Sequence, residues 1–135
     1  MKQRLTSYII PLSLIFVSFI ILLIRARYSF CWSDESFYFS TINRFYEGDS
    51  IFRHEWHPTQ LFSVIALPFY AAYVGITGST AGIILYFRVL FAVIELGCAL
   101  FVFFILNKHH GGYCAVTAAL LTQWYVHINI ATVSY

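Results

Sequence analysis

The chain has 135 residues, of which 60% are hydrophobic, 20% aromatic and only 10% charged. Soluble domains carry about 25% charged residues, so this composition excludes an ordinary soluble protein and predicts an integral membrane protein. The net charge of +2 is small and spread along the chain, which gives no case for nucleic-acid binding. The three cysteines are widely spaced and predict neither a disulfide framework nor a zinc site.

The first apolar segment, residues 8–24, follows a basic start that contains Lys2 and Arg4. Its uncharged length is within the roughly 17–25 residues that cross a bilayer as a helix. No small-residue cleavage pattern follows, so we interpret it as a retained transmembrane anchor rather than a signal peptide. The basic start favours a cytoplasmic N-terminus, although Arg25 and Arg27 counterbalance it.

Residues 25–57 form the extended polar segment and hold most of the acidic residues. A short helix is predicted over 33–47, with Ser33 as its N-cap and Asp34 and Glu35 in the first turn. Aromatic and aliphatic residues recur along it at helical spacing. We therefore expect an amphipathic helix that lies in the membrane interface.

Three further apolar segments follow. Residues 58–74 carry no charge but contain Pro68, which leaves two interpretations: a kinked transmembrane span, or a loop helix that enters one leaflet and returns. Residues 81–106 and 113–133 are predicted transmembrane helices on either side of a polar turn. We expect a single all-α integral membrane module with three transmembrane helices plus amphipathic or re-entrant helices in the first outer loop. Four transmembrane helices are the alternative.

Two acidic or histidine-containing motifs could carry chemistry. Asp34 and Glu35 are either first-turn residues of a capped helix or carboxylates that bind a polar substrate or act as a base. His54 and His57 are three residues apart rather than four, which excludes a zincin helix and leaves metal binding a minor alternative.

Arg88 and Glu95 lie within a predicted span. Burial of either at mid-membrane costs roughly 2.5–3.5 kcal/mol, so each should face the bundle interior or a water-filled cavity. Two helical turns separate them by about 10 Å along the axis, so each needs another partner. For Arg88 that partner is either a structural polar contact or a bound phosphate.

The order of these features resembles the N-terminal module of GT-C superfamily glycosyltransferases. The resemblance is to the polyprenyl-phosphate-sugar-dependent group related to protein O-mannosyltransferases and lipid A aminoarabinose transferases. In that group the first outer loop opens with a "DE" pair and a short helix ending in glycine; a His-Pro motif and an arginine follow. The matching residues here are Asp34, Glu35, Gly48, His57, Pro58 and Arg88. The chain departs from the motif at Thr59 and Gln60, where proline and leucine are expected.

The resemblance implies that the 58–74 helix belongs to the outer loop, and it implies roles for the candidate residues. Asp34, supported by Glu35, would contact or deprotonate an acceptor hydroxyl. Arg88, His57 or Arg53 would stabilise the lipid phosphate. The implied partners are a polyprenyl-phosphate sugar donor and membrane lipids, with other membrane subunits as further candidates. A divalent metal cofactor is left open. The implied location is the bacterial plasma membrane, within the cell envelope.

Members of this superfamily are several times longer than the present chain. We therefore interpret it as the N-terminal part of such an enzyme and expect the 135-residue chain alone to be inactive. The alternatives are a small non-catalytic membrane protein, or an accessory that handles lipid-linked sugars.

Overall fold

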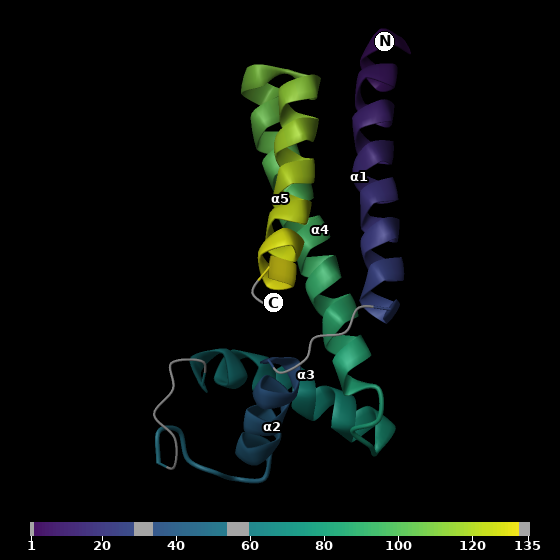
Figure 1. Cartoon of the computed structure of the whole chain (residues 1–135). Helices are drawn as coiled ribbons and strands as arrows, with labels where there is room; N and C mark the ends of the chain where they lie inside the picture. Colours follow the sequence, from purple (N-terminus) through teal and green to yellow (C-terminus); the bar gives the residue numbers. More distant parts are fainter. Residues whose placement is uncertain (1, 29–33, 54–59, 133–135) are drawn as a thin grey trace. The chain divides into compact units, whose positions relative to one another are not determined.

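A computed structural model describes residues 2–28, 34–53 and 60–132, with side chains for 8–28, 36–53 and 60–124 (Figure 1). The described residues form helices and turns without a strand, which confirms the expected all-α fold. The five helices are α1 (Lys2–Tyr28), α2 (Asp34–Tyr46), α3 (Gln60–Thr77), α4 (Ile83–His110) and α5 (Gly112–Thr132).

Three helices in the described part are long and apolar enough to cross a membrane: α1 over Tyr8–Tyr28, and α3 and α4 over their full lengths. The chain is therefore an all-α membrane protein with three candidate spans. α3 corresponds to the segment for which the sequence left a span and a loop helix open. α5 has 21 residues and matches the last predicted helix closely in its bounds.

The chain divides into two compact units, which we describe separately. Unit 1 consists of Met1–Ser29 and Phe87–Tyr135, and it contains α1, α5 and most of α4. Unit 2 is the intervening segment Phe30–Tyr86, and it contains α2 and α3.

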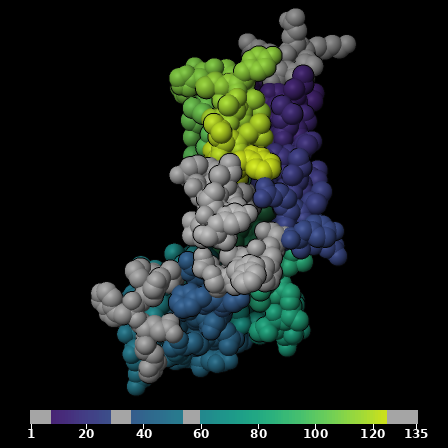
Figure 2. Space-filling model, in the orientation of Figure 1, coloured from purple at the N-terminus to yellow at the C-terminus, as the bar shows by residue number. Residues whose placement is uncertain are grey.

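Unit 1 is built around small residues that allow its helices to approach closely. The buried cluster consists of Ile15 from α1, Ala99 and Phe103 from α4, and Ala115, Val116 and Ala119 from α5. α1 packs directly against α5, and Figure 2 shows their atoms, purple and yellow, side by side. Without strong hydrophobic driving force between helices in lipid, such close packing is the main source of association.

The contacts of unit 1 also define the helix directions. Along α1, Ile15 packs in the cluster near the start of α5, whereas Ser18 meets Trp124 further along α5. α1 and α5 therefore run parallel, and α4 runs antiparallel to both (Figure 1). The start of α1 and the α4–α5 turn consequently lie at the same end of unit 1.

Unit 2 consists of α2 packed on α3. Ile42 of α2 is fully buried, and the rings of Tyr38 and Phe62 lie 5.4 Å apart between centroids. Tyr46 and Tyr70 form a second ring contact at 5.6 Å. Part of the apolar face of α2 thus lies against α3, while Phe37 and Tyr46 are exposed. The interfacial position of α2 stays a prediction.

Candidate functional site

The acidic pair stands at the beginning of α2, whose first residue is Asp34. This agrees with the predicted helix start, where the unsatisfied N–H groups and the helix dipole favour negative charge. The side chains of Asp34 and Glu35 lie outside the described part of the structure, so their catalytic role stays a prediction.

The other end of α2 is closed by a Schellman motif centred on Gly48. Its N–H donates to the carbonyl of Phe45 at 3.1 Å, and the N–H of Asp49 donates to the carbonyl of Arg44 at 2.9 Å. Gly48 has φ +99°, a left-handed conformation that glycine adopts without steric cost. The helix ends at the glycine that the sequence indicated.

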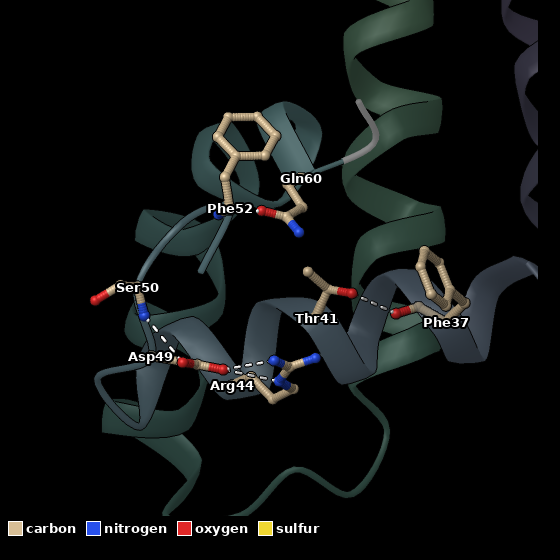
Figure 3. Close-up of polar contacts among 7 residues, drawn as sticks. All are labelled: Phe37, Thr41, Arg44, Asp49, Ser50, Phe52 and Gln60. Carbon is tan, nitrogen blue, oxygen red and sulfur yellow. Dashed lines mark hydrogen bonds and ion pairs between the residues drawn. The ribbon is translucent and has the colours of Figure 1, made fainter. Parts of the chain in front are cut away.

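An ion pair reinforces this turn. The Nε and NH2 groups of Arg44 donate to Oδ2 of Asp49 at 2.9 and 2.7 Å, and Oδ1 of Asp49 accepts from the backbone N–H of Ser50 at 3.0 Å (Figure 3). The two side chains are 34% and 22% exposed. This pair was not predicted from the sequence, although an arginine in the last turn followed by an Asp beyond the glycine is a usable signal.

A polar network joins α2 to α3. The hydroxyl of Tyr70 donates to Oδ1 of Asn43 at 2.7 Å, and Nδ2 of Asn43 donates to Oε1 of Glu47 at 2.8 Å. Tyr70 is only 2% exposed, so its hydroxyl needs such a partner. The network was missed because Tyr70 lies in a segment that reads as uniformly apolar.

A hydrogen bond joins the loop that contains Arg53 to the start of α3. The N–H of Phe52 donates to Oε1 of the buried Gln60 at 2.8 Å, which links the loop after α2 to the first residue of α3 (Figure 3). Phe52 has φ +58°, a strained conformation that this bond helps to retain. Arg53 follows directly and is exposed. His57 lies outside the described residues.

Arg88 contacts the carboxyl end of α1 within unit 1. Its NH1 group donates to the carbonyl oxygen of Ala26 at 2.7 Å. That carbonyl belongs to the last turn of α1, where no intrahelical N–H is available, and a cation there also complements the helix dipole. Arg88 was expected to need a polar partner other than Glu95, and the carbonyl oxygen of Ala26 is one such partner. The binding of a phosphate by Arg88 stays a prediction.

A second polar contact crosses unit 1. Nε1 of Trp124 donates to Oγ of the buried Ser18 at 2.9 Å, and the guanidinium of Arg25 lies 5.6 Å from the Trp124 ring centroid, within cation–π range. These residues were not predicted from the sequence, because no local sequence pattern indicates that α1 packs against α5.

The sequence leaves metal binding open at the acidic and histidine motifs. Among the residues that the structure describes, no group of three His, Cys, Asp or Glu side chains could hold a metal ion. His54 and His57 lie outside that part of the chain.

Comparison of the chain with protein-family models, curated proteins and solved structures found no match. The resemblance to GT-C glycosyltransferases therefore stays a prediction based on short motifs.

Proposed function

We propose that this chain is the N-terminal part of a GT-C type membrane glycosyltransferase. It would move a sugar from a polyprenyl-phosphate donor to an acceptor hydroxyl on the outer face of a bacterial plasma membrane. The observation that carries the proposal is the position of Arg88 at the carboxyl end of α1. The order of Asp34, Glu35, Gly48, His57, Pro58 and Arg88 along the sequence supports the proposal as well.

The chemistry needs a proton acceptor and a cation. The acceptor oxygen forms a bond to the anomeric carbon of the sugar, and the bond between that carbon and the phosphate oxygen breaks. The hydroxyl proton passes to the carboxylate of Asp34, oriented by Glu35; a positioned base contributes about 10²–10⁴-fold. The polyprenyl phosphate leaves as an anion, so Arg88, Arg53 or His57 would stabilise its charge.

The contact of Arg88 supports a phosphate-binding role. The bond from NH1 to Ala26 positions one nitrogen of the guanidinium, a planar group that suits bidentate phosphate recognition. Arg53 is exposed directly after the strained Phe52, which is compatible with a second phosphate contact.

A second candidate function is a non-catalytic membrane protein or an accessory of lipid-linked sugar handling. The internal pairing in unit 2 favours it, because Arg44 binds Asp49 and Asn43 bridges Glu47 and Tyr70. In this case Arg88 serves only to cap α1, and the carboxylates serve only the start of α2.

Two measurements separate these functions. The first is transfer of radiolabelled mannose or aminoarabinose from its polyprenyl phosphate in membranes that contain the full-length enzyme of which this chain would be the N-terminal part. Asp34→Asn should abolish the transfer at equal abundance. The second is binding of a fluorescent polyprenyl phosphate to the detergent-solubilised full chain. Arg88→Lys keeps a cation near Ala26 but loses the planar fork, so affinity should fall several-fold, while Arg27→Lys should leave it unchanged. Equal affinity in all three proteins would contradict the phosphate role.

A further inference from the structure

The two faces of α3 differ in an unusual way. The residues buried on it are Gln60, Ser63, Ala66 and Tyr70, three of which are polar. Its large exposed side chains are all apolar: Leu61, Ile65, Phe69 and Ile76, with 59%, 70%, 42% and 86% exposure. At about 100° of rotation per residue the two sets fall on roughly opposite sides of the helix. α3 therefore places its polar groups inside unit 2 and a continuous apolar stripe outside.

The inner face is covered by α2 and the loop that follows it. Tyr70 bonds to Asn43 of α2, and Gln60 bonds to the N–H of Phe52. Two aromatic rings of α2, those of Tyr38 and Tyr46, also pack on this side of α3. Neither set of contacts involves the exposed stripe.

Charge is segregated in the same way. α3 contains no Asp, Glu, Lys or Arg, whereas α2 and its terminal turn carry Arg44, Glu47 and Asp49. Unit 2 thus has a charged helix on one side and an uncharged apolar helix face on the other.

We propose that the stripe formed by Leu61, Ile65, Phe69 and Ile76 is a lipid-contact surface covered by the hydrocarbon of the bilayer. α3 thereby makes a membrane contact of unit 2 through this stripe. The predicted interfacial position of α2 stays a prediction, and the inference is independent of the proposed glycosyl transfer.

Hydrocarbon fits this surface better than water or a protein partner. Transfer of apolar side chains out of water is favourable in proportion to their area, and a contiguous apolar stripe of this length is unusual on a water-facing surface. The stripe offers no charge and no polar side chain to specify a protein partner. α3 also has the length and apolarity of a membrane helix, and its own backbone hydrogen bonds satisfy the requirement of a lipid environment.

The proposal is tested by spin labels on the full chain in phosphatidylcholine–phosphatidylglycerol vesicles. In a background of Cys31→Ser, Cys98→Ala and Cys114→Ala, single cysteines replace Ile65 or Ile76 on the stripe. Ser40→Cys, on an exposed position of α2, is the matched control. Collision of each label with oxygen, which concentrates in hydrocarbon, is compared with collision with the water-soluble complex NiEDDA.

We expect the oxygen-to-NiEDDA collision ratio at 65 and 76 to exceed that at 40 several-fold. A ratio at 65 and 76 as low as at 40 would mean that the stripe faces water and would overturn the proposal. Low collision with both reagents would mean that a protein segment covers the stripe, which would overturn it equally. Circular dichroism of each labelled protein shows that the helices are retained.

Discussion

Arg88 and Ala26, 62 residues apart in the chain, are joined by a hydrogen bond of 2.7 Å from the guanidinium to the backbone carbonyl. The bond closes unit 1 at the end where α1 stops and α4 enters the bundle. A buried helix end without such a partner would leave an unsatisfied carbonyl. The arginine that the sequence marks as a candidate phosphate ligand is thus also a helix cap.

Removal of this cap should destabilise unit 1. Arg88→Met keeps the length of the side chain but has no donor, so the free energy of unfolding should fall by about 2 kcal/mol, a typical value for a hydrogen bond to a charged group. Arg27→Met, at an exposed position of the same helix end, should change it little. Unfolding by SDS in mixed micelles, followed by circular dichroism, measures both. Equal effects of the two substitutions would show that Arg88 does not act as a cap.

The bond between Trp124 and Ser18 should appear as a coupling energy between α5 and α1. In a double-mutant cycle of Trp124→Phe and Ser18→Ala, we expect about 0.6 kcal/mol, the average for hydrogen bonds between membrane helices. Ser13 bonds within α1 to the carbonyl of Ile10, so Ser13→Ala should show no coupling to Trp124→Phe. A coupling of zero in the first cycle would contradict the contact.

The turn between α3 and α4 should tolerate no side chain at Gly82. It has φ +82°, and an added Cβ would lie 3.0 Å from the hydroxyl of Tyr73, which itself donates to the carbonyl of Ala81. Gly82→Ala should therefore lower the free energy of unfolding by about 1–3 kcal/mol.

Substitutions at two other glycines separate the two causes of the stability loss in Gly82→Ala, which are the positive φ and the close contact with Tyr73. Gly78 has φ +66° with open space around it, so Gly78→Ala carries the conformational cost alone and should be milder. Gly75 is helical and unobstructed, so Gly75→Ala should stabilise by up to about 1 kcal/mol through helix propensity. Thermal unfolding of the three variants in detergent gives the ranking. A Gly82→Ala protein as stable as Gly75→Ala would refute the tight turn.

Replacement of Gln123 by an apolar side chain should raise the free energy of unfolding. It is fully buried, and within the described part of the chain neither of its amide atoms has a hydrogen-bond partner. Gln123→Met has a similar shape without the desolvation cost, so we expect the free energy of unfolding to rise by about 1–2 kcal/mol. Gln123→Glu, which buries a carboxyl instead, should lower it. The same SDS titration measures both; a loss of stability in Gln123→Met would mean that the amide is satisfied.

The helices of this protein are largely readable from its sequence. Local patterns are sufficient for the membrane class, for the all-α fold and for the positions of the apolar helices. They also place the start of α2 at its acidic pair and its end at Gly48, because capping depends on residues within one turn of the helix end. Even the need of Arg88 for a polar partner follows from the cost of burying a charge in an apolar helix.

Only the tertiary structure decided which groups meet. The partner of Arg88 is a backbone carbonyl, which no residue pattern distinguishes, and Trp124 and Ser18 meet through helices far apart in the chain. The aromatic face of α2 has the amphipathic pattern of an interfacial helix, and two of its rings, Tyr38 and Tyr46, contact Phe62 and Tyr70 of α3. An amphipathic sequence specifies which face of a helix is apolar. Which segment packs against that face is decided by contacts between residues that are distant in the chain.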